Sequence, residues 1–201
     1  PIGLTQSPGG QFLGIFNSRT INISGLTLVH GNGISLQASG VTLTGVAVQN
    51  SLNTGISVSA GRNLLLDGDV SAISITNSAG DGIAVRSGSM LDVSGSVTIS
   101  GSGSEGIFMR GGTTRMSPGD SGLIDIANNA GGGISGDDAS TLNVFSSAAP
   151  GNVSIHGNGG PGLALFGGNL DMENVLINGN LTNPPLYSGL DFVQIVFIAS
   201  T

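Results

Sequence analysis

The chain has 201 residues, a net charge of −7 and no cysteine, and charged residues make up 8% of it. Its 36 glycines, low charge and many β-branched residues, without a Gly-X-Y period, exclude a collagen helix and a disordered chain. All five basic residues are arginine, so no nucleic-acid partner is expected, and the absence of cysteine excludes disulfides and zinc-thiolate sites.

A short motif returns along the whole chain: a glycine, then Ile or Leu, any residue, and usually a second apolar residue. Its glycines stand at positions 14, 33, 55, 82, 106, 133, 162 and 189. Two further apolar-any-apolar segments follow each copy, such as Leu64-Leu65-Leu66 and Ile73-Ser74-Ile75. Alternation with a period of two is typical of a strand with one buried face, so each repeat is expected to hold three short strands.

These strands are too short for hairpins, so each is expected to pair in parallel with its equivalent one repeat later, about 4.8 Å away. The apolar residues then stack into a continuous core that no repeat could bury alone, and parallel crossovers favour the right hand. The sequence predicts an all-β fold, a right-handed parallel β-helix (β-solenoid) of about eight coils, as one domain over residues 1–201. Residues 1–13 are expected to form an N-terminal cap, and residues 181–201 a C-terminal coil with an open edge.

The turns between coils carry residues that tolerate a left-handed backbone. Asn50, Asn77 and Asn128 each follow a third strand, where stacked amide side chains can form a ladder. His30, Gly101 and Gly157 are expected to replace asparagine in other coils, and His156 to stand in the same turn as a substitute for the ladder. The glycine before each first strand is likewise expected to adopt a positive φ at a tight corner.

The coil pattern resembles the right-handed parallel β-helix superfamily of pectate-lyase-like solenoids, which includes pectate lyases, polygalacturonases, phage tailspikes and bacterial surface proteins. Asn77–Ile83 is similar to a polygalacturonase motif with an insertion, and Gly136-Asp137-Asp138 is similar to a second one but lies two coils late. The Gly-His-Gly and Arg-Ile-Lys motifs of that family have no match. The resemblance therefore implies the fold and an extracellular or cell-surface setting, and it names no reaction.

Charged side chains gather in the central coils. Residues at matched positions of neighbouring coils become neighbours on the surface, which places Asp81 beside Glu105 before the first strand and Arg86 beside Arg110 after it. The candidate catalytic residues are Asp81, Glu105 and Asp92, and the candidate ligand-binding residues are Arg86, Arg110, Arg115 and Phe108. Ordinary surface pairing, such as Asp92 with Arg115, is the competing interpretation.

This arrangement suggests a shallow groove for an acidic or neutral glycan, because arginine holds carboxylates by paired hydrogen bonds and Phe108 offers a ring to stack on a sugar. In a hydrolase the acidic pair would act as acid and base. The resemblance to β-helix lyases implies instead an arginine base beside a calcium site. No cofactor is expected apart from calcium, for which Asp67 and Asp69 offer oxygen ligands in what is more simply a solvated turn.

The leading hypothesis is an extracellular or cell-surface module of structural or adhesive type that binds carbohydrate. The alternative is a polysaccharide lyase or glycoside hydrolase of the β-helix class acting on an acidic polysaccharide. A third hypothesis is end-to-end or face-to-face self-association, because the apolar run Leu190–Ile198 would leave a sheet edge open. The C-terminal run Phe192–Ala199 is too short to span a bilayer, so no membrane insertion is expected.

Overall fold

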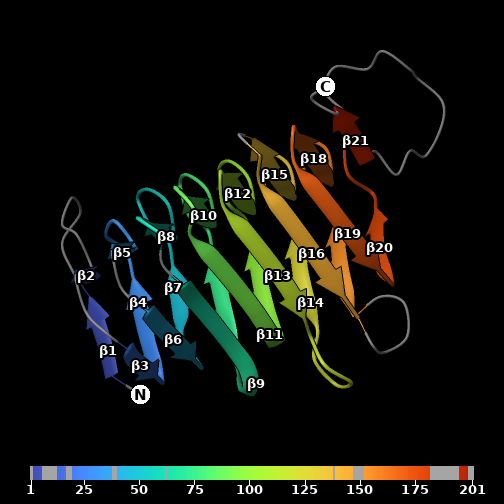
Figure 1. The fold of residues 1–201 in the computed structure, drawn as a ribbon. Coiled ribbons are helices and arrows are strands. Elements are labelled where there is room, and N and C mark those ends of the chain that lie inside the picture. Colours follow the sequence, from blue (N-terminus) through green and yellow to red (C-terminus); the bar gives the residue numbers. More distant parts are fainter. Residues whose placement is uncertain are drawn as a thin grey trace.

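The computed structural model describes residues 2–5, 13–16, 20–37, 40–61, 63–137, 139–146, 152–181 and 195–198. All regular structure in these ranges is β-strand, and Figure 1 shows the strands stacked side by side in successive coils. No helix in the described part of the chain is long and apolar enough to cross a membrane.

The first strands of the coils form one parallel sheet of eight described strands. In spatial order they are β2 (Leu13–Phe16), β5 (Ile34–Gln37), β8 (Ile56–Ser59), β10 (Ile83–Arg86), β12 (Ile107–Arg110), β15 (Ile134–Asp137), β18 (Leu163–Phe166) and β21 (Ile195–Ile198). Equivalent residues lie opposite each other, so that Ile107 is the partner of both Ile83 and Ile134. The glycine-led motif therefore marks one continuous face.

The second and third strands form a 13-stranded sheet that bends around the other faces. The second strands are β3 (Thr20–Ser24), β6 (Gly40–Thr44), β13 (Thr113–Ser117), β16 (Thr141–Phe145) and β19 (Asn169–Glu173). The third strands are β1 (Ile2–Thr5), β4 (Leu26–Val29), β7 (Ala47–Gln49), β14 (Ile124–Ala127), β17 (Val153–His156) and β20 (Val175–Asn178). In two coils the second and third strands are continuous, as β9 (Asn63–Thr76) and β11 (Met90–Ser100).

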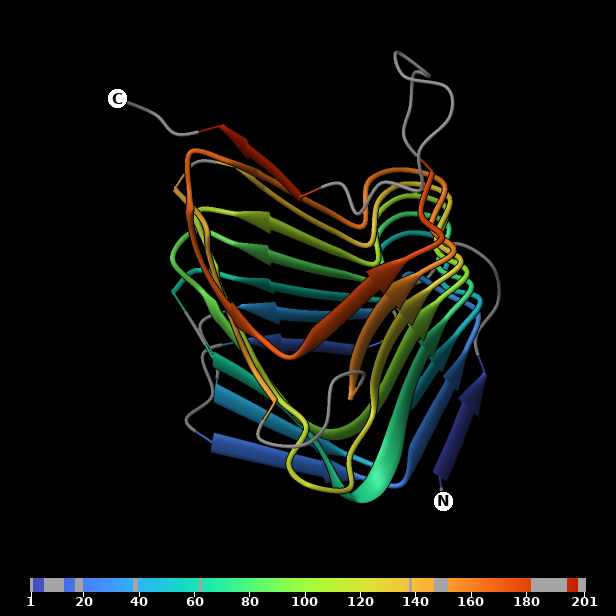
Figure 2. The ribbon, with the colours of Figure 1, turned by 90° about the vertical axis from the view of Figure 1, so that its right-hand side faces the viewer.

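The coil is right-handed. Seen along the axis in Figure 2, the chain passes counter-clockwise through the first, second and third strands as it approaches the viewer. The predicted fold class is confirmed, but about five turns are complete rather than the predicted eight. These are the coils that begin at β5, β8, β10, β12 and β15, whose strands pair on both sides on all three faces. In the outer coils, at least one described strand has a partner on one side alone.

The core consists of columns of aliphatic side chains that run along the axis. Ile56, Ile83 and Ile107 occupy one such column and are fully buried. Each of these side chains packs against its equivalents one coil above and one coil below. The burial of each coil therefore depends on its neighbours, as expected for a solenoid.

At both ends of the chain, the strand register departs from the register that the repeat predicts. The repeat matches Gly14 with Gly33, but in the structure Gly14 lies opposite Ser35, and Ile15 lies opposite Leu36. A shift of two residues keeps Ile15 on the inward face, because side chains alternate with a period of two. The eighth motif, at residues 189–192, lies outside the described residues, and β21 pairs with β18 instead. At the other end, β1 extends the ladder of third strands by pairing with β4.

In most coils the residue before the first strand has to be glycine, because neighbouring atoms leave no room there for a Cβ atom. Gly33 has a φ of 80°, as predicted, whereas Gly82, Gly106 and Gly133 are not among the residues with positive φ. A Cβ atom on Gly106 would lie 2.6 Å from Cγ2 of Ile126 and 2.7 Å from the carbonyl oxygen of Gly133. The prediction of a positive φ is wrong for these coils. Glycine is required there because the close approach of the next coil leaves no space for a side chain.

The left-handed turn after the third strand is confirmed at His30, Asn50, Asn77 and Asn128, whose φ angles lie between 54° and 64°. The Nδ2 group of Asn77 donates a hydrogen bond to Oδ1 of Asn50 at 3.2 Å. The prediction is also confirmed at Gly101 and Gly157, whose φ angles are 68° and 63°. It is wrong for His156, which ends the strand β17 before the turn.

A buried amide ladder lies one residue beyond this turn in the later coils. Nδ2 of Asn129 donates to Oδ1 of Asn158 at 2.9 Å, and Nδ2 of Asn158 donates to Oδ1 of Asn180 at 2.7 Å. The same oxygens also accept backbone N–H groups from the preceding coil. Serines occupy the position in earlier coils, for example the buried Ser78 and Ser102. The ladder therefore ties the later coils together through side chains as well as through strands.

Candidate functional site

Three arginines lie where the first strand turns into the second in the central coils. Arg86 ends β10 and Arg110 ends β12, and the two residues are direct neighbours in the first-strand sheet. Arg115 follows a short turn later, in β13. All three are exposed, and they are all of the arginines in the described ranges, since Arg19 and Arg62 lie outside them. We call this cluster of Arg86, Arg110 and Arg115 the arginine corner.

Phe108 lies on the first-strand face beside the arginine corner. It occupies the second position of β12, and its neighbours in the sheet are Ala84 and Ser135. The guanidinium carbon of Arg86 lies 5.8 Å from the centroid of the half-buried ring, within the range of a cation–π contact. This contact holds Arg86 toward the first-strand face.

Asp137 borders the arginine corner on the side of the next coil. It is the partner of Arg110 in the first-strand sheet, and its backbone carbonyl accepts a hydrogen bond from Gly111 at 3.2 Å. The Gly-Asp-Asp stretch that resembles polygalacturonases thus places its first aspartate next to an arginine. Asp138 lies outside the described residues.

Asp81 and Glu105 lie side by side at the start of the same first strands, as their positions in the repeat predict. The backbone ladder joins their coils, with Gly82 donating to the carbonyl of Glu105 at 2.9 Å. The hydroxyl of Ser104 donates to the Glu105 carboxylate. Burial raises the pKa of the Asp81 carboxyl above its usual 3.8, a hydrogen bond with Ser104 lowers it in part, and the charge of Glu105 raises it.

The acidic pair and the arginine corner lie at opposite ends of the first strand. Five residue steps separate Asp81 from Arg86, which corresponds to about 16 Å of extended chain. No single reacting bond can therefore lie against both groups. Of the candidate residues, the structure brings together Asp81 with Glu105, Arg86 with Arg110 and Phe108, and Asp92 with Arg115.

We expect Asp81→Asn to stabilise the fold at neutral pH. Because folding raises the pKa of Asp81, the folded state holds the proton more tightly, and the ionised carboxylate weakens the fold. This cost is present above the folded pKa and disappears below the usual value of 3.8. Urea unfolding should show the variant to be more stable than the parent at about pH 7 and the difference to shrink toward about pH 3. A difference that does not change with pH would contradict this cause.

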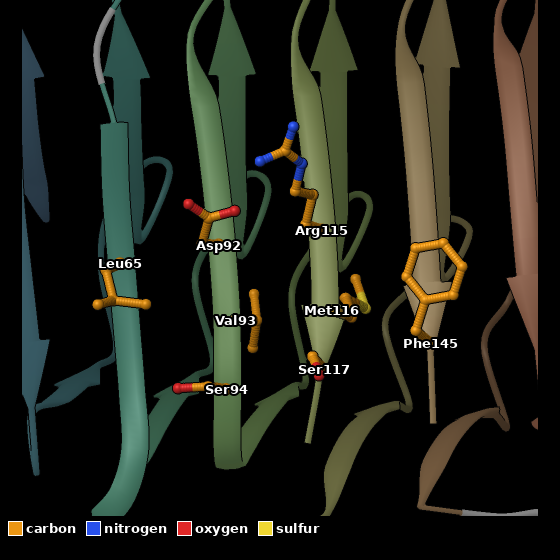
Figure 3. A pocket seen from close by; sticks show the side chains of 8 residues that line it. All are labelled: Leu65, Asp92, Val93, Ser94, Arg115, Met116, Ser117 and Phe145. Atoms are coloured by element: carbon orange, nitrogen blue, oxygen red, sulfur yellow. The ribbon is translucent and has the colours of Figure 1, made fainter. Parts of the chain in front are cut away.

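A hollow of about 230 Å³ lies on the outer face of the second strands, next to the arginine corner (Figure 3). It is lined by Leu65, Asp92, Val93, Ser94, Arg115, Met116, Ser117 and Phe145. Ser94 and Ser117 are partners on the adjacent strands β11 and β13. The hollow forms because these two small side chains stand between larger ones, and Phe145, which is 45% exposed, closes one end.

Asp92 and Arg115 form the charged side of this hollow. They are partners across β11 and β13, as the matched positions predict. Burial raises the pKa of Asp92, and the positive charge of Arg115 lowers it in part. Leu65 and Phe145 were not predicted as site residues. Met116 is the partner of Val144 in the next coil. Ser117 follows Met116 and Phe145 follows Val144, so Phe145 continues the outward column of Ser117.

The acidic and histidine side chains that could hold a metal ion lie on different faces of the solenoid. Asp67 and Asp69, the candidate calcium ligands, lie in the bend of β9, where the N–H of Asp69 donates to Oδ1 of Asp67 at 3.2 Å. His156 Nε2 lies 3.0 Å from Oδ1 of Asp125 on the third-strand face. Within the described ranges, no group of three or more such side chains is placed to hold a metal ion.

Comparisons with known proteins find no match. No protein-family model matches the chain, and no curated protein and no solved structure matches it. The structure shows a parallel β-solenoid, and the predicted membership in the pectate-lyase-like superfamily stays a prediction. The function is therefore argued from the arginine corner, the acidic pair and the hollow themselves.

Proposed function

We propose that the chain is an extracellular or cell-surface β-solenoid module, structural or adhesive in type, that binds an acidic polysaccharide at the arginine corner. One observation carries the proposal: Arg86 and Arg110 are direct neighbours on adjacent strands, with Arg115 across one turn, in a chain whose net charge is −7. Like charges directly opposite on adjacent strands are destabilising, and a bound carboxylate offsets that repulsion. The position of Arg86 beside Arg110 therefore favours a ligand that carries carboxylates.

The scaffold suits a repeating ligand. Adjacent strands lie about 4.8 Å apart, so Arg86 and Arg110 present two guanidinium groups one coil apart along the axis. Guanidinium binds a carboxylate through two parallel hydrogen bonds, which adds geometric specificity to the charge. Because the strands are rigid and the Phe108 ring holds Arg86, little conformational entropy is lost on binding.

The double variant Arg86→Ala/Arg110→Ala tests the proposal. Hydrogen bonds to charged groups contribute about 1.5–3 kcal/mol each, so the variant should bind oligoalginate or oligogalacturonate at least about tenfold more weakly. Calorimetric titration would measure the loss. The matched variant Arg86→Lys/Arg110→Lys keeps the charge without the fork geometry and should retain part of the affinity. Equal affinity of the parent and the alanine variant would refute the proposal.

Asp81 and Glu105 favour a second candidate function, hydrolysis of the bound polysaccharide. Their strands are about 4.8 Å apart, close to the carboxylate separation of about 5–5.5 Å in retaining glycosidases. A carboxyl whose pKa is raised suits a general acid, the role proposed for Asp81.

Incubation with acidic polysaccharides should then release new reducing ends, and Glu105→Gln should abolish the release. Unsaturated uronates, which absorb in the ultraviolet, would identify lyase chemistry instead. If neither product forms with any acidic polysaccharide, the binding function stands without catalysis.

A further inference from the structure

The hollow and the arginine corner share one side chain. Arg115 belongs to the arginine corner and also lines the hollow beside Ser117. A ligand that extends from Arg110 across the turn onto the second-strand face therefore reaches the hollow at Arg115. This continuity connects the hollow to the proposed ligand.

The lining of the hollow matches the two surfaces of a sugar ring. Figure 3 shows Leu65 and Phe145 at opposite ends of the hollow, with Asp92 and Arg115 along one side. A pyranose presents an apolar C–H face, which stacks on an aromatic ring, and a rim of hydroxyl groups. The Asp92 carboxylate accepts hydrogen bonds from such hydroxyls, and the Arg115 guanidinium donates to them.

The charge of the hollow selects a neutral ring. Asp92 and Arg115 are direct partners, so their charges offset each other. Because the pair carries no net charge, the hollow offers a uronate carboxylate no net attraction, in contrast to Arg86 and Arg110. The volume of about 230 Å³ is below the range of about 300–1,000 Å³ that is typical of pockets for larger ligands, which limits the occupant to one ring.

We infer that this hollow is a subsite for one neutral sugar ring, adjacent to the acidic ring that the arginine corner binds. The inference rests on the proposed function and refines it. The preferred ligand is a polysaccharide in which acidic and neutral sugars alternate. A polymer built of uronates alone occupies the arginine corner and leaves the hollow unused.

Two probes and two matched variants of the full chain test this inference. The probes are hyaluronan oligosaccharides, in which a uronate alternates with a neutral amino sugar, and alginate oligosaccharides of equal length, which contain uronates alone. Ser117→Leu fills the hollow from an exposed position in β13. Ser24→Leu is its control, because Ser24 is exposed in the same outward column of the distant strand β3.

We expect the parent chain to bind hyaluronan at least about tenfold more tightly than alginate, since one further ring is stacked and hydrogen-bonded. Ser117→Leu should abolish this preference and leave the alginate affinity unchanged, whereas Ser24→Leu should alter neither. Phe145→Ala should reduce the preference as well. Its control is Phe166→Ala, which removes a ring of similar exposure, 46%, at the end of β18.

Equal affinity of the parent chain for both probes, or an unchanged preference in Ser117→Leu, would overturn the inference. The proposed function would survive that result if Arg86→Ala/Arg110→Ala still lost alginate binding. If the parent chain bound neither probe, the proposed function itself would fail and the inference with it. Unfolding midpoints of all variants show whether each one has folded.

Discussion

Replacing Asn158 with Ala should lower the free energy of unfolding by about 3–5 kcal/mol. Asn158 is fully buried, and its side chain makes four hydrogen bonds. Its Nδ2 group donates to the carbonyl of Ile126 and to Oδ1 of Asn180. Its Oδ1 atom accepts from the backbone N–H and from Nδ2 of Asn129. Alanine would leave these partners unsatisfied inside the molecule, and each unsatisfied group costs about 1–3 kcal/mol.

Urea unfolding followed by circular dichroism measures this loss. The control is Asn53→Ala, whose side chain makes an exposed hydrogen bond of 2.9 Å to Asn32. Water replaces the partner at such a site, so the control should change the free energy of unfolding by less than about 0.5 kcal/mol. If both variants lost a similar free energy of unfolding, burial of the amide ladder would not determine its contribution to stability.

Gly133→Ala should destabilise the fold by about 3 kcal/mol or prevent folding altogether. The added Cβ atom would lie 2.3 Å from Cγ2 of Ile155 and 2.6 Å from the carbonyl oxygen of Gly162. The carbonyl belongs to the following coil, and Ile155 belongs to the third strand, β17, of the coil that Gly133 begins. The carbonyl cannot move away without breaking the parallel ladder, so the methyl group forces the two coils apart.

Gly88→Ala is the control that separates crowding from backbone conformation. Gly88 has a φ of 70°, and a Cβ atom there would meet no atom within 4 Å. Its replacement should cost about 1 kcal/mol, which is the conformational penalty of a left-handed alanine. Thermal unfolding of both variants compares the two costs. A loss in Gly88→Ala as large as that in Gly133→Ala would contradict the argument from close packing.

Much of the fold could be predicted because its determinants are local. Apolar alternation with a period of two defines the inward face of each strand, and the glycine-led repeat defines where each coil begins. Matched positions in the repeat then predict which side chains are neighbours, which is why Asp81 with Glu105 and Arg86 with Arg110 could be paired in advance.

Other features depend on contacts between coils and were decided by the tertiary structure. The two-residue shift of Ile15, the close approach at Gly133 and the ladder through Asn158 arise from how one coil packs on the next. The hollow beside Phe145 forms because two serines from adjacent coils happen to meet. The sequence by itself determined the strands, their inward faces and the matched columns. The tertiary structure decided the register of the outermost first strands, the space left at the glycines and the hollow, because these depend on the volumes of side chains brought together from successive coils.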